Sequence, residues 1–244
     1  MPETPLPPTL TTAQRREHYD DFVAAVLDLC ATNSIRSDLA SGRGRPLEEC
    51  GARMQQYLVA RVSRYGARRA HYTVASLIAM QRHLVHEDGL YTPEFAVPAP
   101  DDSTTEAARL PAAESDSPLD EPAHTPVPGS SPAGGPVAGE RTAVRHWRAR
   151  PDLGSSLAIA VARHGFKQHR MDDQVKILTR LSSPLLHPLL WRLTSRLANR
   201  DAARLDFAVL LEDLARWDYD QLHIADRWRE SYFQTLDRLV SQED

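Results

Sequence analysis

Arginine is the residue type whose spacing in this sequence carries the clearest chemical meaning. Arg192, Arg196 and Arg200 recur every four residues, which places their side chains on one face of a helix. The alternative is a solvated face held by ion pairs, but Asp201 is the only acidic residue close to this segment. Trp191 beside them could stack on a base, although core packing is the expected role of a tryptophan in a leucine-rich helix. The spacing therefore predicts a surface on which guanidinium groups contact successive phosphates.

The first half of the chain offers a second group of arginines. Arg36, Arg43 and Arg45 fall in a polar segment that also contains Gly42 and Gly44, and we expect this segment to be a loop. Such a loop lets both backbone and side chains approach a phosphate. Four more arginines flank Gly66 and are equally compatible with phosphate contact and with a solvated helix junction: Arg61, Arg64, Arg68 and Arg69.

A third group of cations precedes Arg192, Arg196 and Arg200, which we call the arginine ladder. It consists of Lys167, Arg170, Lys176 and Arg180. Lys176 could instead form an ion pair with Asp172 or Asp173, which lie three and four residues before it. The two aspartates could be imagined as a metal or acid pair, but adjacent side chains on a helix point about 100° apart. Compensation of the dipole at the start of a helix explains them more simply.

The sequence lacks the common motifs of catalysis and metal binding. It contains no phosphate-binding loop, no dinucleotide-binding glycine pattern, no HExxH and no GxSxG. His83 and His86 could share a helix face, but two ligands do not fix a metal, and His164 and His169 are interpreted in the same way. The two cysteines form no CxxC pair. We therefore expect no catalytic residue, no metal and no cofactor.

Charge is distributed unevenly along the chain, although the net charge is only −4. Residues 34–86 carry nine arginines against three acidic residues, and residues 141–204 carry thirteen Arg or Lys against four. Residues 93–140 have a net charge of −8. This segregation favours a polyanion-facing surface on a protein whose other faces keep it soluble. No window approaches the roughly 18 apolar residues needed to span a bilayer, so we expect a cytoplasmic protein with no membrane partner.

Apolar periodicity predicts an all-α fold made of two small helical bundles joined by a long Pro-rich disordered insert. The N-terminal lobe is placed at residues 1–90, the insert at 91–141 and the C-terminal lobe at 142–244. The insert has almost no large apolar residues and no hydrophobic period, so it cannot offset the entropy of ordering. Stripes at helical spacing occupy residues 19–30, 46–66, 71–84, 153–165, 172–181, 183–197, 206–217 and 224–236.

Several segments follow one another in an order that matches a known family. In the second half these segments are residues 156–165, 175–180, 190–193 and 205–214, closing at Trp217 and Trp228. In the first half they are residues 35–39 and 74–79. In order and spacing the chain resembles the small subunit (the CasB family) of Cascade, the type I-E CRISPR surveillance complex. The long insert and the pair Asp172–Asp173 depart from the family pattern.

The resemblance implies a non-catalytic subunit of an antiviral complex. Its partners would be other Cascade subunits, a second copy of itself, the CRISPR guide RNA, and the target and non-target DNA strands, with no small-molecule substrate. The subunit would hold the displaced non-target strand and the target strand, and so stabilise the R-loop. The residues implied in nucleic-acid contact are Arg36, Arg43, Arg45, Lys176, Arg180, Arg192 and Arg196, to which the helical spacing adds Arg200.

Two other classes of protein fit parts of the sequence. A helical protein–protein scaffold would have no nucleic-acid affinity of its own, and the segregation of charge disfavours it. A small helical hydrolase would need a convergent set of His, Asp or Glu residues, which the sequence does not indicate.

Overall fold

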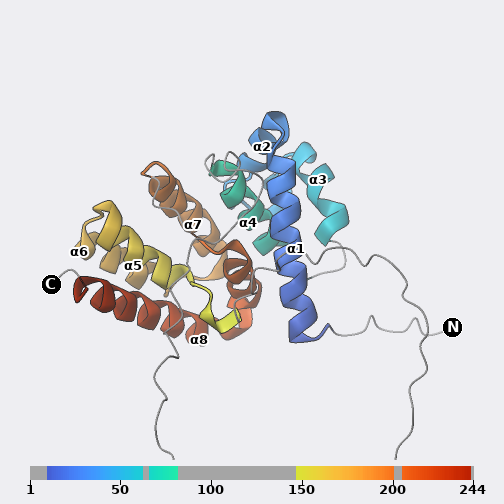
Figure 1. Ribbon diagram of the computed structural model, residues 1–244. Helices are drawn as coiled ribbons and strands as arrows, with labels where there is room; N and C mark the ends of the chain where they lie inside the picture. Colours follow the sequence, from blue (N-terminus) through green and yellow to red (C-terminus); the bar gives the residue numbers. More distant parts are fainter. Residues whose placement is uncertain (1–9, 63–65, 82–146, 201–204, 243–244) are drawn as a thin grey trace, which may run out of the picture. The chain divides into compact units, whose positions relative to one another are not determined.

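The computed structural model describes residues 10–62, 66–81, 147–200 and 205–242, and within these ranges the chain is helical without a strand (Figure 1). The prediction of an all-α fold is confirmed. The first four α-helices are α1 (Thr12–Cys30), α2 (Asn33–Ala40), α3 (Ala52–Val62) and α4 (Arg68–Met80). The others are α5 (Leu153–His164), α6 (Gln168–Leu178), α7 (Ser183–Ala198) and α8 (Phe207–Val240). Short 3₁₀ turns, η1 (Leu47–Glu49) and η3 (Trp147–Ala149), precede α3 and α5.

Helix boundaries follow local capping chemistry. Thr11 and Gln14 form a capping box at the start of α1, in which the Gln14 N–H donates to the Thr11 hydroxyl at 3.3 Å. Asp206 caps α8 by accepting from the N–H groups of Ala208 and Val209 at 3.2 and 3.1 Å. Gly165 ends α5 with a φ of +65°, a left-handed conformation that glycine adopts without steric cost.

One local prediction was wrong. The polar segment that contains Arg36, expected to be a loop, includes α2, because Ile35 and Leu39 fall on one helix face and Leu39 is fully buried. The two helices expected at 206–217 and 224–236 are separated by a kink at Asp220, where a φ of −135° and a ψ of 26° are non-helical, and together they form α8. At this kink the side chains of Trp217 and Gln221 both donate to the Leu181 carbonyl at 3.0 Å, which anchors α8 to the turn before α7.

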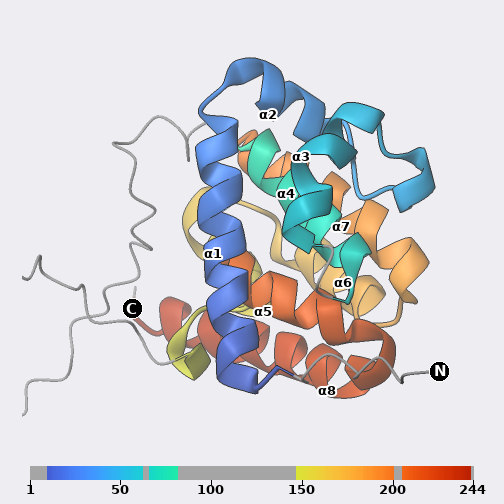
Figure 2. The same cartoon turned by 90° about the vertical axis from the view of Figure 1, so that its right-hand side faces the viewer.

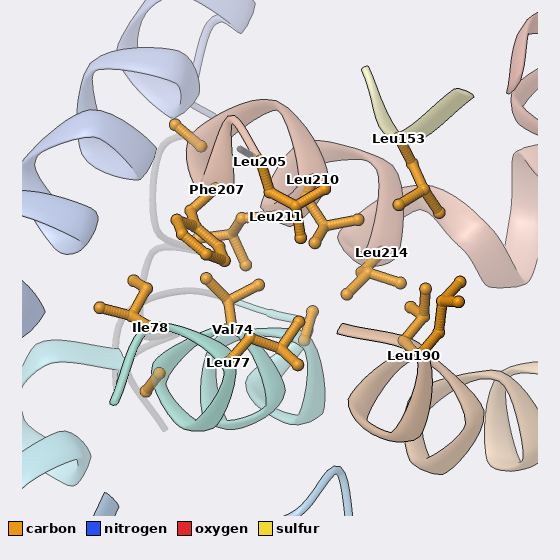
Figure 3. Packing of buried hydrophobic residues seen from close by; sticks show 14 of the residues in the cluster. Val74, Leu77, Ile78, Leu153, Leu190, Leu205, Phe207, Leu210, Leu211 and Leu214 are labelled. Carbon is orange, nitrogen blue, oxygen red and sulfur yellow. The ribbon is translucent and has the colours of Figure 1, made fainter. Parts of the chain in front are cut away.

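Helix α4 lies at the centre of the core. Every residue from Ala70 to Ala79 is buried, as the nearly continuous apolar run predicted. Figure 3 shows Val74 and Leu77 of α4 directed toward Phe207 and Leu211 in the first turns of α8, with Leu190 of α7 close by. Helices of both halves of the chain therefore share one hydrophobic cluster.

Contacts place all eight described helices in one compact unit. Within it α1 contacts both α4 and α8, and α4 contacts α7 (Figure 2). The boundaries of the predicted lobes at residues 90 and 142 remain predictions, and the insert at 91–141 lies outside the described residues. None of the described helices is long and apolar enough to cross a membrane.

The contact between α5 and α8 is close and contains buried polar groups. A Cβ on Gly154 would lie 2.0 Å from the Trp228 carbonyl oxygen, so only glycine allows this approach. Asp152 accepts from Ser231 Oγ at 2.7 Å, and the fully buried Asp213 accepts from Trp228 Nε1 at 2.7 Å and from the Arg227 guanidinium. These acidic residues therefore have structural partners in the α5–α8 contact.

Candidate nucleic-acid interface

The side chains of α6 and α7 enclose an open cleft of about 460 Å³. We call it the α6/α7 cleft and define it by its lining residues. The cationic ones are Lys167, Arg170, Arg196 and Arg200, and the apolar ones are Phe166, Met171 and Leu193. Gly165, Gln174 and Asn199 complete the lining. The cleft therefore combines a basic rim with an apolar floor.

The positions of these side chains follow from the local folding of α5, α6 and α7. Gly165 ends α5 and turns the chain, so that Lys167 becomes the residue before the first turn of α6. Met171 of α6 and Leu193 of α7 are buried at 3% exposure each, which leaves the cations of both helices outside the core. In α6 and α7 the apolar residues face the core, so the charged residues of the two helices lie together on the exposed surface.

Two interactions fix part of the rim. Arg196 Nη2 donates to Gln174 Oε1 at 3.2 Å, and this bond joins α7 to α6. The Arg200 guanidinium lies 4.8 Å from the centroid of the Phe166 ring, a cation–π contact between two lining residues of the cleft. Neither interaction neutralises the positive charge, so both arginines can still attract an anion.

The structure brings together only part of the predicted arginine ladder. Arg192, Arg196 and Arg200 are all exposed, as the spacing predicted, but only Arg196 and Arg200 line the α6/α7 cleft. Lys176 on α6 and Arg180 after it are exposed and lie outside the cleft lining. Their part in nucleic-acid contact stays a prediction.

The predicted arginines of the first half are separated by the structure. Arg36 is half-buried on α2, whereas Arg43 and Arg45 are exposed on the loop after it. The Arg43 guanidinium lies 5.6 Å from the centroid of the Trp191 ring on α7. A Cβ on Gly44 would lie 2.4 Å from the carbonyl oxygen of His187, so the loop packs directly on α7. Arg43 is therefore placed beside the helix that carries the arginine ladder.

Of the four arginines near Gly66, one has a structural contact in the described part of the chain. Arg69 Nη2 donates to the Pro184 carbonyl at 3.0 Å, which gives this residue a structural contact with the first turn of α7. Arg61 and Arg68 are exposed, and Arg64 lies outside the described residues. We therefore leave this group out of the candidate interface.

Ion pairing separates the described arginines into two sets. Carboxylates pair with Arg16, Arg150, Arg216, Arg227 and Arg229. Within the described ranges, no ion pair involves the eight predicted contact residues, nor Lys167 or Arg170 of the α6/α7 cleft. This includes Lys176, for which pairing with Asp172 or Asp173 was the alternative. Their charges remain available to a polyanion.

The two aspartates of α6 do not have the role expected from the sequence. Because α6 begins at Gln168, they lie beyond its first turn and cannot compensate the helix dipole there. Asp172 instead accepts a hydrogen bond from the Tyr232 hydroxyl at 2.7 Å, which contributes with burial to raising the pKa of Tyr232. Asp173 is exposed.

The described histidines and acids do not assemble a metal centre. No group of three His, Cys, Asp or Glu residues in the described ranges could hold a metal ion. His164 is half-buried and His169 is exposed, while His83 and His86 lie outside the described residues.

Sequence reasoning gave too little weight to Lys167 and Arg170, and did not consider Phe166 as a contact residue. The cations were noted as added charge but excluded because acidic residues follow them. The signal in the sequence that could have located these cations is Gly165. This glycine ends α5 and lets the chain turn, so the residues after it lie close to other helices. What the sequence could not indicate is that this turn faces the end of α7.

Comparison with known proteins supports the fold. No protein-family model matches the sequence, and no curated protein matches it. Among solved structures, a chain described as "CRISPR RNA-guided surveillance complex" aligns with a TM-score of 0.62 and 22% identity, covering 94% of this chain and 99% of that one. A chain of a "CRISPR RNA-guided surveillance complex, pre-nicking" gives 0.64 and 23% over the same shares. The protein therefore has the all-α fold found in chains of these complexes.

Proposed function

We propose that this chain is a non-catalytic subunit of a CRISPR RNA-guided DNA surveillance complex, of the CasB small-subunit kind found in Cascade. Its role would be to bind nucleic-acid backbone without reading sequence. The observation that carries the proposal is the separation of the described arginines into a paired set and an exposed or half-buried set that has no carboxylate partner among the described residues. The fold shared with chains of such complexes supports the same role.

The physical mechanism is electrostatic retention of the R-loop. In RNA-guided recognition, base pairing with the guide reads the sequence, and the exchange of duplex for R-loop is nearly balanced in energy. A few phosphate contacts are then enough to shift the balance. The cations of α7 and the α6/α7 cleft would hold the displaced non-target strand or the target strand, with counterion release as the driving force.

Membership of a complex also requires surfaces for protein partners. Tyr219 and Leu222 on α8 are 72% and 82% exposed, the two highest values among the exposed large hydrophobic side chains of the described residues. They favour a protein contact, with another subunit of the complex or with a second copy of this chain. They are also the observation that favours the alternative function, a helical scaffold without nucleic-acid affinity of its own.

Nucleic-acid binding across a salt series tests the proposal. The double variant Arg192→Ala/Arg196→Ala removes two exposed charges of the interface. Its matched control, Arg53→Ala/Arg238→Ala, removes two exposed charges from α3 and the end of α8 that form no ion pair with any residue the structure describes. We expect the logarithmic salt slope for single-stranded DNA to fall by about 1.4 in the first variant, because each phosphate contact contributes about 0.7. Equal slopes in both variants would contradict the assignment of the interface.

Retention of the R-loop in the assembled complex is the functional readout. With normal incorporation of the subunit, the interface variant is expected to lose the R-loop faster than the control variant. If neither the wild-type chain nor the assembled complex bound DNA through this subunit at low salt, the scaffold alternative would replace the proposal.

A further inference from the structure

The α6/α7 cleft has an apolar floor that phosphate binding alone does not explain. Phosphates are held by exposed cations in contact with water, whereas Phe166, Met171 and Leu193 form a hydrophobic bottom beneath four cations. Nucleotides combine a charged phosphate with a flat, largely apolar base. We infer that this cleft takes up one unstacked nucleotide of a single-stranded nucleic acid, an inference that rests on the proposed function.

The size of the cleft fits this ligand. Its volume of about 460 Å³ lies within the range of pockets that hold small organic molecules. A base in a duplex is stacked and paired, so it cannot enter a side-chain cleft without being displaced from the helix. The cleft therefore favours single strands over duplexes.

The Phe166 ring and the Arg200 guanidinium, both in the lining of the cleft, provide a stacking surface. The Arg200 guanidinium carbon lies 4.8 Å from the centroid of the Phe166 ring, a cation–π contact. Bases stack on both aromatic rings and guanidinium planes in proteins that bind single strands. Because every base has such a face, this contact would not select for sequence.

Polar groups around the floor match the remaining parts of a nucleotide. Gln174 and Asn199 line the cleft. Their amides both donate and accept hydrogen bonds, so they can pair with acceptors or donors on the edge of a base. The start of α6 borders the cleft at Lys167, and no side chain caps its first N–H groups. These N–H groups and the Lys167 ammonium can hold the adjoining phosphate.

The test compares a poly-thymidine strand with the same strand carrying several abasic residues, which keeps every phosphate. With the full-length protein, we expect the intact strand to bind at least about fivefold more tightly, as the loss of one stacked base predicts. A strand with 2-aminopurine at one position should also change in fluorescence on binding, because its base leaves the stack of its neighbours.

The variant Phe166→Leu preserves an apolar floor but removes the ring, and its far-ultraviolet circular dichroism checks that it folds. We expect it to bind intact and abasic strands equally, whereas Arg170→Ala should weaken both strands in parallel. Equal, salt-dependent binding of the two strands by the wild-type protein would overturn the nucleotide pocket and leave the proposed function standing. No binding of either strand at low salt, by the chain alone and through this subunit in the assembled complex, would instead remove the proposed function, and the pocket with it.

Discussion

The Arg43 guanidinium lies 5.6 Å from the centroid of the Trp191 ring, so a loop in the first half of the chain is held against a helix in the second. Trp191 is half-buried, and it packs against the core while its ring still meets Arg43. This contact places Arg43 beside α7, the helix that also carries Arg192. Cations that are about 150 residues apart in the sequence therefore belong to one candidate interface.

The first prediction concerns Arg43. Replacement by Ala should lower the free energy of unfolding by only about 0.5–1 kcal/mol, the contribution of an exposed cation–π contact, because the side chain forms no ion pair within the described ranges. If Arg43 contacts a phosphate, the logarithmic salt slope for single-stranded DNA falls by about 0.7. Arg53→Ala on α3 is the control. A slope that equals the wild-type value would place Arg43 outside the interface.

A second prediction concerns Arg150, which joins three parts of the fold. It forms a bidentate ion pair with Asp206, the cap of α8, at 2.6 and 2.7 Å, and contacts Asp20 of α1 at 2.7 Å. Its side chain is 13% exposed and that of Asp206 only 1%. Replacing Arg150 by Ala leaves a buried carboxylate unpaired, so we expect a loss of about 3–5 kcal/mol in the free energy of unfolding.

Urea unfolding of the full-length protein measures this loss. Arg229→Ala is the comparison, because Arg229 pairs with Asp226 at the surface of α8, where both side chains are largely exposed. Surface pairs contribute about 0–1 kcal/mol. Similar losses in the two variants would show that burial of the Arg150 cluster does not matter for stability.

Much of the fold could be predicted because helical periodicity and capping are local. The apolar run of α4, the Asp206 cap and the Gly165 end of α5 were all visible in the sequence and are present in the structure. The missed helix α2 is short, and its single buried residue, Leu39, receives a tertiary contact in which Ser76 Oγ donates to the Leu39 carbonyl at 2.9 Å. Such a contact cannot be read from local periodicity.

The sequence predicted a set of cations for the candidate site, but it did not predict which of them lie together in one cleft. The spacing of Arg192, Arg196 and Arg200 correctly indicated one exposed face. Which cations share a cleft depends on how α6 packs on α7, and this packing brings Lys167 and Arg170 next to Arg196 while it leaves Arg192 outside. How two helices pack depends on the fit of side chains from both helices, so the apolar stripe of one helix does not predict its neighbour.

Gly154 gives a third prediction. A methyl group there would meet the Trp228 carbonyl oxygen at 2.0 Å, and backbone cannot move aside as a flexible side chain can. Gly154→Ala should therefore separate α5 from α8 and lower the free energy of unfolding by about 1–3 kcal/mol or more. Gly51→Ala is the matched control, because a Cβ there has no neighbour within 4 Å. Equal stability of the two variants in thermal unfolding would contradict the close approach of α5 and α8.

The last prediction concerns acid stability and rests on His187. This residue is 1% exposed, and its Nδ1 lies 2.8 Å from the Thr73 hydroxyl in the contact between α7 and α4. Burial, together with the nearby charge of Arg69, lowers the pKa of His187 to about 3. The folded protein therefore keeps this ring neutral at pH values where the ring of the unfolded chain, with a pKa near 6.5, is already protonated.

Because the folded pKa lies below the unfolded one, the stabilising contribution of the neutral ring is complete above pH 6.5 and is lost as the pH falls toward 3. Between pH 7.5 and pH 5 this single residue should remove about 2 kcal/mol from the free energy of unfolding. His187→Gln retains a hydrogen-bonding side chain without a titrating group, and urea unfolding at both pH values should show a smaller difference in the variant than in the wild-type protein. If the pH dependence is the same in both, His187 is not a source of the acid sensitivity, and the half-buried His18, whose pKa is lowered to about 4, becomes the residue to replace next.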